Sequence, residues 1–308
     1  MVLHGRLCGR VGHRRTSFER SRPIIGRLLL VNRRFVGAVN PNAIEEEPTM
    51  AEHDARRGST PRRDPGSSQR REDRDALAPR HDDPPIPDDV VPADLDRGAR
   101  VQLKTLTKEN AEFVARHLVM AGRLIEQDPQ LAHQHALAAA RRGGRIAVVR
   151  ESVGITAYTV GDYALALREL RTYRRISGSD EQLPLMVDSE RGLGRPDRAL
   201  ELARSVPPAT LTAGTRVSLA IAKSGARLDQ GNAEAALAEL QIPELDPDVA
   251  FSYSPALFDA YATVLEELGR SDEAAEWFER SERASAALGL DDDDGGDDEI
   301  EVVEEPGQ

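Results

Sequence analysis

The chain of 308 residues has one cysteine, Cys8, and only 4% of its residues are aromatic. One cysteine can form neither an internal disulfide framework nor a cysteine metal cluster, and such a chain suits a reducing compartment. Spanning a bilayer takes about 20 apolar residues. The most apolar run near the N-terminus, residues 24–31, has eight residues and contains Arg27. We therefore expect a cytoplasmic protein that does not enter a membrane.

The sequence also lacks the motifs of common catalytic and metal sites. It has no Gly-rich phosphate-binding loop and no HExxH motif. His133 and His135 are two residues apart, so on a helix they point to different faces. If an EF-hand loop began at Asp291, Gly295 and Val302 would occupy its fifth and twelfth positions, which require an acid and a glutamate. We therefore expect no enzymatic activity, no cofactor and no metal.

The first 49 residues form an Arg-rich leader. Residues 1–44 contain nine arginines and one acid, Glu19. An Arg-rich leader with so few acids resembles an organelle transit peptide. The abrupt change in composition at Met50 favours a different interpretation, in which translation starts there and residues 1–49 are upstream sequence read in frame.

Composition divides the rest of the chain into three segments. Residues 50–104 are a charged, Pro-rich linker and residues 291–308 an acidic tail, which has ten acids and no base up to residue 305. Low hydrophobicity with high charge is typical of disorder. We therefore expect the core to lie within residues 105–290, and we expect residues 1–100 and 291–308 to be dispensable for folding.

A short phrase recurs four times in the core, each time with a glycine followed five residues later by an alanine. The glycines are Gly161, Gly194, Gly231 and Gly269, and the alanines are Ala166, Ala199, Ala236 and Ala274. Seven residues before each glycine stands a small or β-branched residue: Gly154, Val187, Ser224 or Ala262. The glycines are 33, 37 and 38 residues apart. A period of this size indicates a repeat array.

The phrase has a physical interpretation. Glycine permits positive φ and ends one helix, and the polar residues after it start the next helix. Small residues then allow the two helices to pack closely. The apolar spacing predicts helices over 108–126, 129–142, 146–160, 162–176, 181–193, 196–205, 211–230, 232–241, 255–268 and 271–288. The expected fold is an all-α solenoid of about five antiparallel helix pairs.

On these residues the chain resembles a tetratricopeptide repeat (TPR) array over about residues 105–288. The resemblance implies a superhelix that binds a protein partner in a groove lined by the first helix of each pair. The outward positions of those helices are then His117, Glu151, Tyr158, Asp188, Arg191, Asp259 and Glu266. Among these, we expect Tyr158, Arg191 and Glu266 to contact the partner.

Charge is distributed unevenly along the core. Residues 101–175 have 12 bases and 7 acids, whereas residues 176–290 have 10 bases and 20 acids. The bases are concentrated in one patch: Arg141, Arg142, Arg145, Arg150, Arg168, Arg171, Arg174 and Arg175. Arg168, Arg171 and Arg175 share one helix face. The patch is either a solvated face that pairs with Glu169 and its neighbours, or a docking surface for an acidic protein, the acidic tail or RNA phosphates.

The leading hypothesis from the sequence is therefore a non-enzymatic scaffold that holds a protein partner. Within the basic patch, Arg142, Arg145 and Arg150 are expected to pack beside Arg168, Arg171 and Arg175 and to bind with them. The alternative is an RNA- or ribosome-associated factor that uses the patch Arg141–Arg175, although the net charge of −12 disfavours nucleic acid. The sequence does not indicate an oligomeric state.

Overall fold

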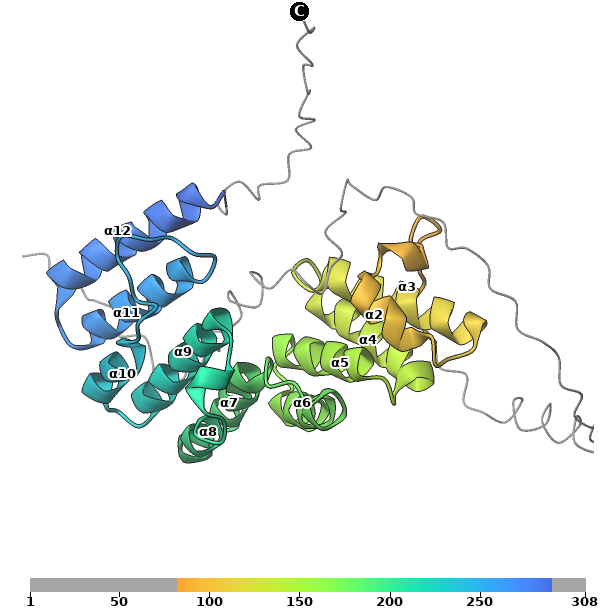
Figure 1. Cartoon of the computed structure of the whole chain (residues 1–308), viewed down its shortest axis with the longest axis horizontal. Coiled ribbons are helices and arrows are strands. Elements are labelled where there is room, and N and C mark those ends of the chain that lie inside the picture. Colours follow the sequence, from red (N-terminus) through yellow and green to blue (C-terminus); the bar gives the residue numbers. More distant parts are fainter. Residues whose placement is uncertain (1–81, 290–308) are drawn as a thin grey trace, which may run out of the picture.

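The computed structural model describes residues 82–289, and within this range the protein consists of helices without strands. Eleven α-helices make up most of it (Figure 1). They are α2 (Arg97–Leu103), α3 (Lys108–Leu124), α4 (Pro129–Gly143), α5 (Ala147–Thr159), α6 (Tyr163–Ser177), α7 (Leu183–Gly192), α8 (Pro196–Ala203), α9 (Ala213–Asp229), α10 (Ala233–Leu240), α11 (Ser254–Glu267) and α12 (Ser271–Ala287). Two short 3-10 helices, η3 (Pro92–Asp94) and η4 (Pro208–Thr210), complete the set.

The helices from α3 onward pack as five successive pairs, α3/α4 to α11/α12, and each pair also contacts the next. The pairs follow one another along an arc, with α5 and α7 towards its inside and α6 and α8 towards its outside (Figure 1). This arrangement is the predicted all-α solenoid of five helix pairs. Each of the ten predicted helices is present, and its ends lie within two residues of the predicted ones.

The turn inside each of the last four pairs depends on a glycine. Gly161, Gly194, Gly231 and Gly269 have φ of 82°, 70°, 74° and 75°, which is the left-handed region that glycine adopts without strain. After Gly161, the backbone N–H of Asp162 donates to the carbonyl of Ala157 at 2.9 Å and closes α5. The Asp162 side chain then accepts from the N–H of Leu165 at 3.0 Å and caps α6.

Small residues set how closely the two helices of a pair approach. Ala166, Ala199, Ala236 and Ala274 are each at most 1% exposed, as the repeat register predicts. Gly154 permits a close approach, because a Cβ placed on it would lie only 2.6 Å from Cδ2 of Leu170 on the partner helix α6. The recurring phrase therefore encodes both the turn and the crossing of each pair.

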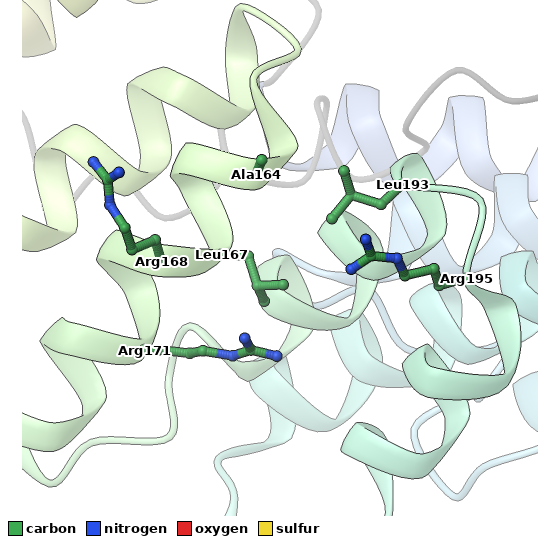
Figure 2. Close-up of a pocket in the computed structure, with 6 residues that line it drawn as sticks. All are labelled: Ala164, Leu167, Arg168, Arg171, Leu193 and Arg195. Carbon is green, nitrogen blue, oxygen red and sulfur yellow. The ribbon is translucent and has the colours of Figure 1, made fainter.

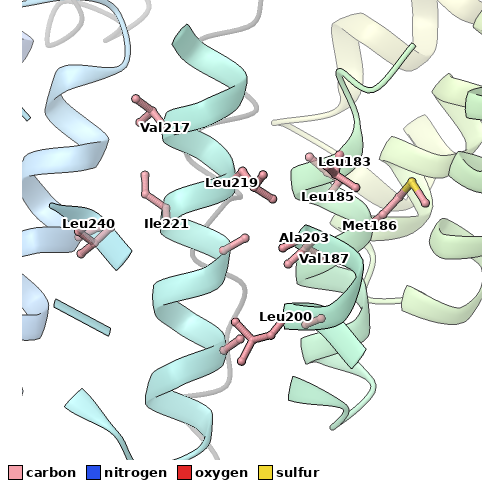
Figure 3. Close-up of a cluster of buried hydrophobic side chains, with 14 of the residues drawn as sticks. Leu183, Leu185, Met186, Val187, Leu200, Ala203, Val217, Leu219, Ile221 and Leu240 are labelled. Carbon is pink, nitrogen blue, oxygen red and sulfur yellow. The ribbon is translucent and has the colours of Figure 1, made fainter. Parts of the chain in front are cut away.

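Three hydrophobic clusters fill the described part of the array, and α5 belongs to each of them. Val148 and Val149 join a cluster with α2, α3 and α4, whereas Ile155 and Tyr158 join a larger one that continues to α12. Figure 3 shows the middle of the larger cluster, where side chains from α7, α8, α9 and α10 meet. Since each pair buries its apolar surface against its neighbours, the pairs depend on one another for stability.

The prediction that residues up to 104 form a disordered linker is wrong for residues 82–104. Val90 and Leu95 are buried against α3 and α4. Arg116 of α3 fixes this segment, because its Nε donates to the carbonyl of Val90 at 2.8 Å and its Nη2 donates to the carbonyl of Pro87 at 3.0 Å. A few apolar residues in a charged, Pro-rich stretch thus cover the open end of the first pair.

The opposite end of the array is covered by α12. Its Trp277 packs against Phe258 and Tyr261 of α11, and its outer face carries the exposed residues Glu276, Glu279, Glu282 and Arg283. Within residues 82–289, no helix is both long and apolar enough to cross a membrane. The predicted leader, residues 50–81 of the linker and the acidic tail lie outside the described residues.

The first test concerns the close crossing of α11 and α12. Ala274→Leu should destabilise the protein by about 1–3 kcal/mol, because the larger side chain overpacks the crossing. Glu279→Leu, on the exposed side of α12, should change stability by less than about 0.5 kcal/mol. Urea unfolding followed by helical circular dichroism measures both. Equal effects would contradict the repeat register.

The second test concerns residues 82–100, which we had expected to be dispensable. A fragment of residues 82–289 should unfold at a higher temperature than a fragment of residues 101–289. Burying Val90 and Leu95 contributes roughly 1.5–3 kcal/mol each, which corresponds to a midpoint at least ~6 °C higher for a domain of this size. Calorimetry of the two fragments and the full chain decides it, and equal midpoints would show that the segment adds nothing.

Candidate interaction site

The candidate site is centred on α6, and residues in the sequence mark both ends of this helix. The Asp162 cap begins the helix, and Gly178, with φ of 70°, ends it. One face is apolar and buries Leu167 and Leu170 against neighbouring helices. The opposite face carries Arg168, Arg171 and Arg175, all exposed, as the spacing predicts.

A buried carboxylate holds two arginines at one end of the site. Glu169 lies beneath the surface of α6. Arg150 of α5 donates from Nη1 to Oε2 of Glu169 at 2.5 Å, and Arg168 donates from Nε to its Oε1 at 2.9 Å. Arg150 is fixed further by a 2.5 Å bond from its Nε to the carbonyl of Gly144.

A second buried carboxylate, Glu190 of α7, repeats this arrangement beside the first. Arg171 donates from Nη2 to Oε1 of Glu190 at 2.9 Å. Nη1 of Arg195, on the turn between α7 and α8, lies 3.6 Å from Oε2, which is too long for a hydrogen bond. Oε2 of Glu190 has no hydrogen-bond partner among the described residues. The Arg195 guanidinium is therefore drawn to Glu190 but keeps donors for a ligand.

The two groups leave positive charge at the surface. Four guanidiniums surround two carboxylates, so two positive charges are uncompensated. The side chains of Arg168, Arg171 and Arg195 are 70%, 57% and 48% exposed. Because the carboxylates are buried and the guanidiniums reach solvent, an approaching molecule meets only the positive ends.

A surface depression of about 400 Å³ lies between these arginines. Its apolar lining consists of Ala164, Leu167 and Leu193, and its charged lining of Arg168, Arg171 and Arg195 (Figure 2). We call these six residues the Arg-rimmed depression. Its chemistry suits an aliphatic side chain flanked by acidic groups, because guanidiniums bind carboxylates with directed hydrogen bonds.

The rest of the predicted basic patch is only partly assembled. Arg150 reaches α6 as expected. Arg142 instead stacks over the ring of Phe113, with its Cζ 3.8 Å from the centroid, and so belongs to the surface of α3 and α4. Arg145 is exposed on the turn before α5. Two parallel basic strips are therefore not formed, because cation–π stacking and burial of the arginine stem draw Arg142 elsewhere.

Two residues expected to line an open groove, Tyr158 and Arg191, are instead buried. The Tyr158 hydroxyl donates to Oδ2 of Asp188 at 2.5 Å, and Arg191 also pairs with Asp188. Arg191 reaches Asp229 of α9 with two hydrogen bonds of 2.8 and 3.2 Å. A Cβ on Gly225 would lie 2.5 Å from Cζ of Arg191, so that glycine makes room for the guanidinium.

The other predicted groove positions differ in exposure. His117, Glu151 and Asp188 are buried, Asp259 is half-buried, and Glu266 is exposed on α11. In the middle of the array, the first helices are enclosed by neighbouring pairs, so their polar side chains bond to one another. The sequence analysis did not select Arg195, because it belongs to the next pair and its spacing from Arg191 and Arg198 does not show that it lies beside α6.

Away from the depression, burial shifts the pKa values of a histidine pair and of a glutamate in opposite directions. Nδ1 of His117 and Nδ1 of His135 lie 2.8 Å apart between α3 and α4. Burial, followed by the nearby His135, lowers the pKa of His117 to about 4. Burial raises the pKa of Glu151 to about 7, although Gln182 donates to its Oε1 at 2.7 Å. The histidines thus favour the neutral form, and Glu151 favours the protonated form.

Comparisons with known proteins give no family for the chain: no protein-family model matches it, and no curated protein matches it. In the described part of the chain, no group of three or more histidine, cysteine, aspartate or glutamate residues could hold a metal ion. The Arg-rimmed depression is thus the candidate site supported by the geometry.

The third test uses Glu151. Because its pKa in the folded state is raised, its contribution to stability is complete below the unfolded pKa of about 4.5 and is lost as pH rises towards 7. Glu151→Gln should therefore raise the unfolding temperature on the order of 5 °C at pH 8 and change it little at pH 4.5. Calorimetry at the two pH values measures this difference.

The histidine pair provides a contrast of opposite sign. Since the pKa of His117 is lowered, its contribution is complete above about 6.5 and is lost as pH falls towards 4. His117→Leu with His135→Leu should therefore reduce the loss of stability between pH 7.5 and pH 5. If both variants shifted the pH profile in the same direction, the assigned protonation states would be wrong.

Proposed function

We propose that the protein is a non-enzymatic adaptor of TPR-like architecture that binds a protein partner through the Arg-rimmed depression. The observation that carries this proposal is the pair of buried carboxylates, Glu169 and Glu190, which hold exposed arginines around an apolar floor. A solvated surface does not need buried acids to position its bases. Such positioning lowers the entropic cost of ordering long side chains when a partner binds.

The proposed surface differs from the groove that the sequence suggested. The predicted groove residues Tyr158 and Arg191 are buried in the array. The depression is formed instead by the second helix of one pair and the turn of the next. A partner that spans this junction contacts two successive pairs, and its binding therefore depends on how they stack.

An RNA-associated role is the second candidate, and the uncompensated arginine charge favours it. Single-stranded RNA is usually held by basic grooves together with exposed aromatic side chains that stack on bases. Near α6, Tyr158 and Tyr173 are buried, and Tyr163 is half-buried against Gly192. The surface therefore offers charge without stacking platforms, which supports an acidic polypeptide over RNA.

The fourth test neutralises the rim. Arg168→Gln with Arg171→Gln should weaken partner binding at least ~tenfold, mainly through association rate, and should flatten the salt dependence of the affinity. Proteins captured by the full chain are purified, and their affinities are measured across a salt series with both chains. Arg204→Gln with Arg283→Gln, which alters two exposed arginines outside the depression, is the matched control.

Thermal unfolding of both variants establishes that the fold is intact. Unchanged affinity and salt slope in the rim variant would refute the proposed site. A 20-nucleotide single-stranded RNA serves as the second ligand. The RNA role would replace the adaptor role if this RNA bound the full chain while the purified captured proteins did not bind the full chain. The logarithm of the RNA affinity should then fall linearly with the logarithm of the salt concentration.

A further inference from the structure

The lining of the Arg-rimmed depression restricts the kind of ligand it can bind more than its charge alone would. Its floor is apolar, and its lining includes three arginines that come from two helix pairs. A fully acidic peptide leaves the floor unfilled, and a purely apolar one leaves the guanidiniums without carboxylates. The complementary ligand is a short extended peptide in which aliphatic and acidic side chains are interspersed.

The chain itself contains such a peptide after its last described helix. Residues 299–305 read EIEVVEE, with three β-branched residues among four glutamates. In an extended peptide, alternate side chains point to the same side, so Ile300 and Val302 can enter a depression together. Glu304 lies on that same side, where it can meet a rim arginine, whereas Glu299, Glu301 and Glu305 point to the opposite side.

We propose that residues 299–305 bind the Arg-rimmed depression and compete there with the external partner. This inference rests on the adaptor function proposed above and adds its regulation. The charge is complementary, because residues 291–305 carry ten acids and no base while the depression carries uncompensated positive charge. Electrostatic attraction gathers the tail at this surface, and the aliphatic side chains provide the specificity.

The covalent link between α12 and residues 299–305 keeps these residues near the array. Glu299 is ten residues beyond Gly289, and ten extended residues reach about 33–36 Å. From the pair α11/α12 to the pair α5/α6 there are three steps between neighbouring pairs, each roughly 10 Å for packed helices. The reach and the span are therefore comparable, so the tail reaches the depression when these ten residues are almost fully extended.

Disulfide trapping in the full chain tests the inference. Cys8→Ser removes the native thiol, and Ala164→Cys with Val302→Cys places one thiol in the depression and one in the tail. Ala164 is suitable because it is exposed and lines the depression. The control replaces Ala164→Cys with Ser177→Cys, an exposed position on the same helix about 20 Å away.

Under mild oxidation, the thiols at 164 and 302 should form a disulfide at least ~tenfold faster than the control pair. Adding Arg168→Gln and Arg171→Gln, or high salt, should reduce the rate to that of the control. Monomers and dimers on a non-reducing gel separate binding within one chain from binding to a second copy, and both support the contact. Equal rates for the test and control pairs would overturn the inference.

A second measurement separates this inference from the adaptor function. Ile300→Ser with Val302→Ser and Val303→Ser should raise the affinity for the captured partner at least ~threefold, because the competing segment is lost. If trapping fails while partner binding still requires the rim arginines, the adaptor role stands and the tail contact is wrong. If trapping succeeds while partner binding ignores those arginines, the adaptor site is wrong.

Discussion

The array depends most on the buried charges of α7. This helix is enclosed by neighbouring helices along nearly its whole length, yet it carries Asp188, Glu190 and Arg191. Each of these charges has a partner on another helix: Tyr158 of α5 for Asp188, Arg171 of α6 for Glu190 and Asp229 of α9 for Arg191. Removing Arg191 would cost on the order of 3–5 kcal/mol, because Asp188 would stay buried without its charged partner. α7 therefore fixes the relative positions of three successive pairs.

The candidate site also depends on buried charges, because the arginines that pair with Glu190 and Glu169 reach the surface. Glu190 faces away from Arg191 and holds Arg171 and Arg195, while Glu169 holds Arg150 and Arg168. The rim arginines are thus anchored to groups that also hold the pairs together. The positions of these side chains therefore depend on the stacking of α5/α6 on α7/α8.

The local structure and the repeat can be predicted from the sequence alone. Glycine at positive φ, a polar cap after it and a buried alanine one turn later are requirements of neighbouring residues, so they are readable from spacing. That is why Gly161 and Ala166 and their three counterparts were placed correctly, together with ten helices. The exposed face of Arg168, Arg171 and Arg175 follows from the same helical period.

Which polar residues face water and which face one another depends on how the helix pairs pack together. The periodicity of α5 and α7 does not show that neighbouring pairs enclose Tyr158 and Arg191, because that burial depends on residues such as Gly225 about 35 positions later. Similarly, Arg195 joins Arg171 only because α7 brings Glu190 between them. Composition averaged over residues 50–104 concealed Val90 and Leu95, whose burial requires the open end of the first pair. Contacts between distant residues were the missing information, since side-chain charge and size set a preference for burial but the packing of other helices decides it.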